Sequence, residues 1–193
     1  MAASDFTKQH IAQAMKELLQ SRSFASVSVS DLTRQCGVGR NTFYYHFHDK
    51  YEVVSWIFFE EIAPLLSRFD RLENWTGGLS ELCLYLQKNR DFYIRVLEFE
   101  GQNSFCQCLT EFYRKLVYDL LRQNGGQSVT ERQMRCVARF VAAGIVEEIQ
   151  NWARNGMESD PTVAIGMLRE LFSGQLIREL QHQPGTLAEC AEQ

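Results

Sequence analysis

Side chains that can bind DNA are concentrated in one short stretch, GVGRNTFYYHFHDK, residues 37 to 50. Arginine can donate two hydrogen bonds to guanine, asparagine can pair with adenine, and tyrosine and threonine hydroxyls can reach phosphate oxygens. An ordinary solvated helix surface carries long charged side chains, because aromatic rings lose free energy by staying wet. The residue types therefore favour contact with a DNA duplex. The alternative is that the tyrosines pack on a neighbouring part of the fold.

Two short amphipathic helices are expected to position these side chains. In the second, Phe43 and Phe47 stand four residues apart and face the core. Ser28 and Asp31 form a capping-box-like start to the first helix, and Gly37 ends it. This spacing predicts a helix-turn-helix. The outward face of the second helix carries Arg40, Asn41, Tyr44, Tyr45 and His48, with Thr42 and His46 on its flank.

Residues 6 to 54 resemble the amino-terminal domain of the TetR family of bacterial transcription regulators. The positions in register with the family signature are Gly37, Val38, Thr42, Phe43, Tyr44, His46, Phe47 and Lys50. Two residues depart from it. Gly39 replaces the usual capping serine and removes one anchoring side chain, and Thr33 replaces a small alanine and affects local packing.

The resemblance implies a role for each residue of the motif. The residues implied to hold the phosphate backbone are Thr42, Tyr44, His46 and Lys50, with Ser28 and Ser30 as further backbone contacts. The residues implied to approach base edges are Arg40, Asn41 and Tyr45.

Bulk composition agrees with a cytoplasmic regulator. The chain has 193 residues, 45% of them hydrophobic and 23% charged, and no apolar run reaches the roughly 18 residues of a membrane span. The formal net charge is −4, but residues 1 to 50 carry +2 and residues 51 to 193 carry −6. The positive part contains the motif, so DNA affinity should depend on salt. The six cysteines have no framework spacing and are typical of reduced thiols.

Helical periodicity extends through the rest of the chain and predicts an all-α protein. We expect a helix-turn-helix DNA-binding domain over residues 1–50 and a helical effector-binding and dimerisation domain over residues 51–193. A linker helix at about 50–63 should join them and break at Pro64, followed by a loop at 74–78. The further helices are predicted at 79–88, 91–97, 105–122, 130–155 and 161 to about 182.

The last two predicted helices carry an apolar surface that is wide for the edge of a monomer. An antiparallel pair of this kind can meet its symmetry mate as a four-helix bundle, and the TetR resemblance implies the same homodimer. The alternative is that both helices close the core of one subunit. The residues expected at the dimer interface are Phe140, Ile145, Ile149, Trp152, Leu168, Leu171 and Phe172.

Aromatic residues in the middle helices could line an effector pocket, although core packing is the commoner reason for such residues. The candidates are Tyr85, Phe92, Phe99, Phe112 and Tyr113. The segments SWIFFEEIAPL and DFYIRVLEF also resemble a subgroup that regulates dihydroxyacetone kinase operons, in which a protein partner is implied as the effector.

Enzymatic and metal-binding functions have little support in the sequence. Cys106 with Cys108, and His46 with His48, are spaced two residues apart, which on a helix points the side chains away from each other. We expect no cofactor, no metal site and no catalysis. The pattern favours a dimeric, effector-controlled DNA-binding regulator, most simply a repressor. The alternative is a helical interaction module that has lost sequence-specific DNA binding.

Overall fold

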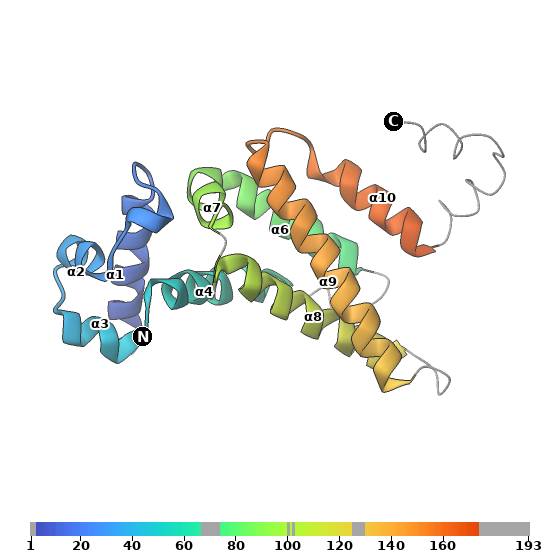
Figure 1. Cartoon of the computed structure of the whole chain (residues 1–193), viewed down its shortest axis with the longest axis horizontal. Coiled ribbons are helices and arrows are strands. Elements are labelled where there is room, and N and C mark those ends of the chain that lie inside the picture. The colour runs from blue at the N-terminus through green and yellow to red at the C-terminus, as the bar shows by residue number, and fades with distance from the viewer. Residues whose placement is uncertain (1–2, 67–73, 100, 102, 125–129, 174–193) are drawn as a thin grey trace. The chain divides into compact units, whose positions relative to one another are not determined.

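The structure is a computed structural model, and it describes residues 3–66, 74–99, 101, 103–124 and 130–173 (Figure 1). The described residues are helical and contain no strand, which confirms the all-α prediction. The helices are α1 (Ala3–Leu18), α2 (Val29–Cys36), α3 (Arg40–His46), α4 (Lys50–Glu61), α5 (Ala63–Leu66), α6 (Trp75–Lys88), α7 (Arg90–Leu97), α8 (Phe105–Asn124), α9 (Glu131–Arg154) and α10 (Pro161–Ser173), with a 3-10 turn, η1, at Phe24–Ser26.

The first three helices form a small module in which α1 packs against α2, α3 and α4. The apolar side chains of its core are almost completely removed from solvent, which is the main source of stability for so small a unit. The fully buried residues of this core are Ile11, Met15, Leu19, Phe24, Leu32, Phe43 and Phe47. The module therefore holds α3 on a packed base.

The linker helix α4 begins at Lys50, as the sequence predicts, and an aspartate caps it. The Asp49 carboxylate accepts hydrogen bonds from the backbone N–H groups of Tyr51 and Glu52, each at 2.8 Å. Helix α4 ends at Glu61 and α5 begins at Ala63, so the helix is interrupted beside Pro64, as expected.

The loop predicted at residues 74–78 is wrong, because α6 begins at Trp75 and includes both glycines of the segment. The Gly77 N–H donates to the Asn74 carbonyl at 2.9 Å, which closes the first turn. Glycine costs a helix about 1 kcal/mol relative to alanine, but tertiary packing routinely offsets such a cost. Gly78 is buried in the packed fold.

Helices α4 and α6 to α9 make the larger part of the first compact unit, with α8 packed along α9 (Figure 1). The side-chain amide of Asn89 donates to the Tyr85 carbonyl at 2.9 Å, where α6 gives way to α7. The buried side chains of this part include Ile57, Phe58, Leu82, Leu86, Tyr93, Val96, Leu109, Ala142 and Val146.

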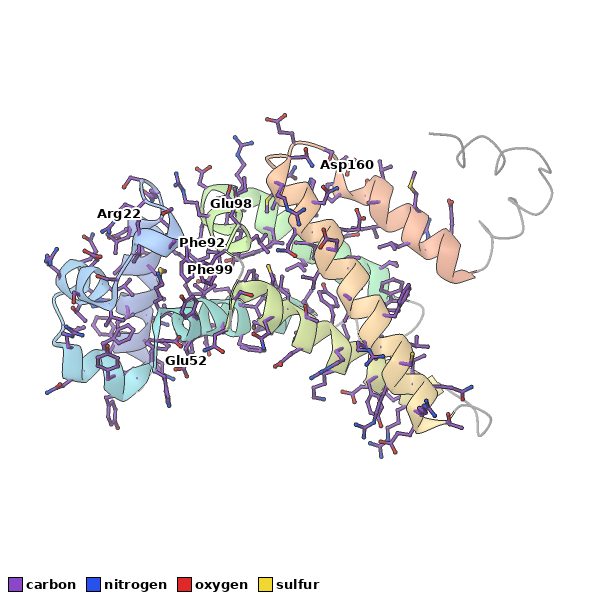
Figure 2. All side chains as sticks on the ribbon, in the orientation of Figure 1. Arg22, Glu52, Phe92, Glu98, Phe99 and Asp160 are labelled. Atoms are coloured by element: carbon purple, nitrogen blue, oxygen red, sulfur yellow. The ribbon has the colours of Figure 1, made fainter. Side chains whose placement is uncertain are left out.

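An aromatic cluster joins this larger part to the amino-terminal module. Phe99, which follows α7, is labelled in Figure 2. Its ring contacts Phe24 of η1 at a centroid distance of 5.5 Å and Tyr51 of α4 at 5.2 Å. A methyl group at Gly101 would lie 2.8 Å from the Phe99 ring, so glycine leaves room for the ring in this position.

A polar bridge makes a second junction between the two parts. The Lys16 ammonium donates to both carboxylate oxygens of Glu61, at 2.6 and 2.7 Å. The Tyr85 hydroxyl bonds to the same carboxylate. Glu61 therefore links α1 to α6 across the end of α4.

The chain divides into two compact units, Met1–Ser159 and Asp160–Gln193. In the second, α10 begins with Pro161 as predicted, and Asp160 accepts hydrogen bonds from the Thr162 N–H at 2.9 Å and hydroxyl at 2.7 Å. The predicted extension of this helix beyond Ser173 lies outside the described residues. No helix among the described residues is long and apolar enough to cross a membrane. The division expected at residue 50 falls inside the first unit and stays a prediction.

Candidate DNA-binding surface

Helix α2 has the capping box that the sequence predicts. The Asp31 N–H donates to the Ser28 hydroxyl at 3.2 Å, and the Ser28 N–H donates to the Asp31 carboxylate at 2.9 Å. The Ser28 hydroxyl and the Ser28 N–H both donate to the Asp31 carboxylate and hold the pKa of Asp31 well below its usual value, with a contribution from Arg22. Gly37 ends α2 in the left-handed region, at φ 69°, where a side chain would be strained. Helix α2 is thus capped at both ends.

Helix α3 is anchored on its inner face by two phenylalanines. Phe43 is 0% exposed and Phe47 is 1% exposed, and their rings lie 5.9 Å apart. Gly39 provides the N-cap position without a side-chain hydrogen bond, which agrees with the departure seen in the sequence. The buried anchors fix which face of α3 points outward.

The outward face of α3 is open to solvent. Tyr45 is 82% exposed and Tyr44 is 48% exposed, although aromatic side chains are usually more buried. Arg40, Asn41 and Thr42 are exposed, and His46 is partly exposed. Neither tyrosine is therefore buried by packing within the described fold. Such packing was the alternative explanation for these two residues.

The predicted serine contacts lie at the start of α2. The Ser28 hydroxyl is exposed but engaged in the capping box, where it donates to Asp31 at 2.6 Å. Ser30 is half-buried, and its carbonyl accepts the Thr33 hydroxyl at 3.2 Å. Thr33 is 7% exposed, so its extra hydroxyl is accommodated by bonding back within α2.

The contacts of Lys50 in the structure differ from those that the resemblance implied. Its ammonium donates to the carbonyl oxygens of Phe24, Ala25 and Val27, at 2.7, 3.2 and 2.8 Å. An ammonium has three N–H donors, so all of them are used inside the fold. Partial burial lowers the pKa of Lys50. Lys50 thus caps the turn before α2 from the start of α4 and does not reach outward.

Two cations of the amino-terminal module were not singled out in the sequence. The Lys8 ammonium lies 5.8 Å from the centroid of the Phe47 ring, at the end of α3. The side chain of Arg34 on α2 is 79% exposed. The only sequence signal for either was the positive charge of residues 1 to 50, which does not say which cation faces outward.

The residues expected at a dimer interface differ in how exposed they are in the structure. On α9, Phe140 is 81% exposed, whereas Ile145 and Ile149 are 2% and 3% exposed, so these two are already buried within one chain. Trp152 is half-buried and donates to the Ser159 carbonyl at 2.9 Å. On α10, Leu168 is half-buried, and the side chains of Leu171 and Phe172 lie outside the described residues.

The aromatic residues expected around an effector do not gather in one cavity. Phe112 lines a groove of about 810 Å³ between α4 and α8. Phe92 and Tyr113 are 7% and 3% exposed and belong to the core. Tyr85 bonds to Glu61, and Phe99 packs on the amino-terminal module, as described above. The common explanation of such residues, core packing, therefore accounts for most of this set.

Metal coordination has no structural support among the described residues. No group of three or more His, Cys, Asp and Glu side chains there is arranged to hold an ion.

Two family models match the chain. One, described as bacterial regulatory proteins, tetR family, covers residues 11–55, and the other, described as a transcriptional regulator C-terminal region, covers residues 73–174. The DhaS activator of the dhaKLM operon from Lactococcus lactis subsp. lactis (strain IL1403), described as HTH-type, is 35% identical over 148 residues, 75% of this chain and 78% of the relative. The expected similarity to regulators of dihydroxyacetone kinase operons is therefore confirmed.

Solved structures share the fold. The FadR fatty acid degradation regulator from Bacillus halodurans matches with a TM-score of 0.63 at 16% identity, over 91% of this chain and 97% of that chain. A DhaS structure matches with a TM-score of 0.55 at 22% identity, over 91% and 96% of the two chains. NalD from Pseudomonas aeruginosa matches with a TM-score of 0.58 at 19% identity, over 89% and 97%. The chain therefore belongs to the tetR family of bacterial transcriptional regulators.

Proposed function

We propose that this regulator acts in the cytoplasm as a homodimer and reads its operator with the outward face of α3. Arg40, Asn41 and Tyr45 approach base edges, and Thr42, Tyr44 and His46 hold the phosphate backbone. The observation that carries this proposal is the exposure of Tyr44 and Tyr45 opposite the buried Phe43. Hydrogen bonds to base edges give sequence preference, whereas phosphate contacts give affinity and salt dependence.

The proposal is tested by selecting binding sites from random duplex DNA with the purified protein and with Arg40→Ala and Tyr45→Ala. The wild-type protein should enrich a pseudo-palindromic site, because two copies of α3 read two half-sites. Each variant should lose selectivity and keep its fold, and the loss for Arg40→Ala should be about 1–3 kcal/mol, the value of a bidentate arginine contact to a base. Arg90→Ala, which removes an exposed arginine from α7, is the matched control and should leave the selected site unchanged.

Two results of the binding-site selection would contradict this proposal. If the folded, dimeric wild-type protein enriches no site, the alternative of an interaction module without DNA reading is favoured. If a site is enriched and survives in both variants, the protein binds DNA but α3 does not supply the specificity.

The homodimer rests on exposed apolar side chains of the last two helices. Val137 and Phe140 on α9 are 43% and 81% exposed, and Val163 and Met167 on α10 are each 60% exposed. Apolar side chains of this size are stabilised when a partner covers them. Sedimentation of wild-type protein and Phe140→Glu tests this, and the variant should sediment as a monomer.

Two directions of control are candidates. Repression follows if the bound dimer blocks transcription, and NalD is named as a secondary repressor of a multidrug efflux pump. Activation is favoured by a specific observation, since the relative with 35% identity is named an operon activator. A reporter driven from the selected operator separates them, because deletion of the regulator raises expression in the first case and lowers it in the second.

The effector is either a small molecule or a protein partner. The FadR of Bacillus subtilis was solved in complex with stearoyl-CoA, which supports a small molecule by analogy. In this chain, the buried Tyr113 hydroxyl has no hydrogen-bond partner among the described residues. A buried polar group without a partner is a place where a bound molecule or water can gain a hydrogen bond.

A further inference from the structure

Arginine and lysine side chains line a groove between α8 and α9, far along the chain from the DNA-binding motif. Residues 51 to 193 carry a net charge of −6, yet residues 111 to 139 contain six Lys or Arg and three Asp or Glu, a net +3. All six cations of this segment are exposed. The cations are Arg114, Lys115, Arg122, Arg132, Arg135 and Arg139.

Helical spacing explains why these charges face one another. On α8, Arg114, Lys115 and Tyr118 follow at intervals that place them on one face. On α9, Arg135 and Arg139 stand four residues apart. Because α8 packs along α9, the two sets form the walls of one groove.

The groove has the size of a small-molecule site. Its volume is about 460 Å³, within the range of roughly 300–1,000 Å³ for such sites. Its lining also includes Ala138, which is 0% exposed. The Arg135 guanidinium lies 6.0 Å from the centroid of the Tyr118 ring, so this cation is placed over an aromatic face.

Most of the positive charge in this region is not neutralised by neighbours. Lys115 pairs with Asp119 at 2.6 Å, and Arg135 pairs with Glu131. Both are exposed pairs one helical turn apart, a class that contributes little to stability and is readily exchanged for a stronger anion. Arg114 and Arg139 form no ion pair with any described residue.

We propose that this groove is a binding site for a small anion with at least two phosphate or carboxylate groups. Guanidinium groups bind both kinds of group through paired N–H donors, and here they come from two helices. A ligand with a single charged group would contact only one wall of the groove. A ligand with two charged groups can contact Arg114 and Lys115 on α8 together with Arg139 on α9. The Glu111 carboxylate also lines the groove and weakens anion binding there.

The test uses inorganic tripolyphosphate and citrate as probes in separate titrations of the full-length protein by calorimetry, at constant ionic strength. The double variant Arg114→Gln/Arg139→Gln removes one guanidinium from each wall. The matched control Lys88→Gln/Arg90→Gln removes two exposed cations elsewhere. Thermal melts without ligand confirm that each variant is folded.

At least one probe should bind the wild-type protein, and the groove variant should bind that probe about tenfold or more weakly for the loss of charge-assisted hydrogen bonds. The control should bind within about twofold of wild type, because its cations lie outside the groove. Glu111→Gln should bind about two- to threefold more tightly, a gain that a misfolded variant would not give.

The probe that binds identifies whether phosphate or carboxylate groups are preferred. The proposal is overturned if neither probe binds, if the control loses as much affinity as the groove variant, or if Glu111→Gln has no effect. The titration needs no operator, so its result is independent of the proposed DNA binding.

Discussion

Replacing Tyr113 with phenylalanine should stabilise the protein, although the substitution removes a polar group. Tyr113 is 3% exposed, and its hydroxyl has no partner among the described residues. Burial also raises the pKa of this hydroxyl well above its usual value. An unsatisfied buried hydroxyl costs roughly 1–3 kcal/mol, and phenylalanine removes that cost while keeping the ring. We expect the free energy of unfolding to rise by about 1 kcal/mol and Tm by about 2–4 °C.

The same substitution at Tyr85 should have the opposite effect. The Tyr85 hydroxyl bonds to Glu61, whose carboxylate also accepts the Lys16 ammonium at 2.6 Å. A hydrogen bond to a charged group contributes roughly 1.5–3 kcal/mol, and partial exposure of Glu61 reduces this to about 1 kcal/mol of destabilisation. The two substitutions should therefore change the free energy of unfolding in opposite directions.

Urea unfolding followed by circular dichroism measures both values in one experiment. Unchanged slopes in denaturant would show that the substitutions alter stability and not the compactness of either state. If Tyr113→Phe is as destabilising as Tyr85→Phe, the Tyr113 hydroxyl has a hydrogen-bond partner, and the inference of an unsatisfied group in the core is refuted.

Three further predictions follow from particular residues. Lys50→Met should lower the free energy of unfolding by about 2 kcal/mol, because three carbonyl oxygens lose their donor, and urea titration measures this loss. The same substitution should leave the salt dependence of DNA binding unchanged, which DNA titrations at several salt concentrations measure. Gly37→Ala should cost about 1–2 kcal/mol in the same urea titration, since its φ of 69° strains any side chain. Cys136 is exposed, so it should react with a thiol reagent at once at pH 8. Burial raises the pKa of Cys83 to about 12, so its thiolate fraction is about 10⁻⁴ and it should react only after unfolding.

Local patterns in the sequence predicted local structure well. The capping boxes at Ser28 and Thr130, the aspartate cap at Asp49 and the proline that opens α10 all lie where short-range rules place them. Each depends on residues within three or four positions, so a single sequence contains the whole signal. The same holds for the inner face of α3, which Phe43 and Phe47 mark by helical spacing.

Local patterns were insufficient where the deciding contact is distant in sequence. Lys50 stands at a helix start, where an outward cation was a reasonable expectation, but its ammonium bonds to carbonyls 23 to 26 residues earlier. Ile145 and Ile149 belong to an apolar stripe, and periodicity alone cannot distinguish burial inside one chain from burial between two. Buried Gly78 shows the same limit, since helix propensity is overridden by packing that the local sequence does not reveal.

The junction contacts give a route by which a shift of α6 or α7 can reach the amino-terminal module. Phe99 contacts Phe24 and Tyr51, and Glu61 ties Lys16 to Tyr85, so these contacts end on α1, on η1 or on α4. Helix α3 is held from within the module by its own buried phenylalanines. A shift of α6 or α7 should therefore move the amino-terminal module as one body and alter where α3 meets DNA, while the side chains on α3 keep their arrangement. In a dimer, such a movement changes the separation of the two recognition helices, which is the quantity that half-site spacing tests.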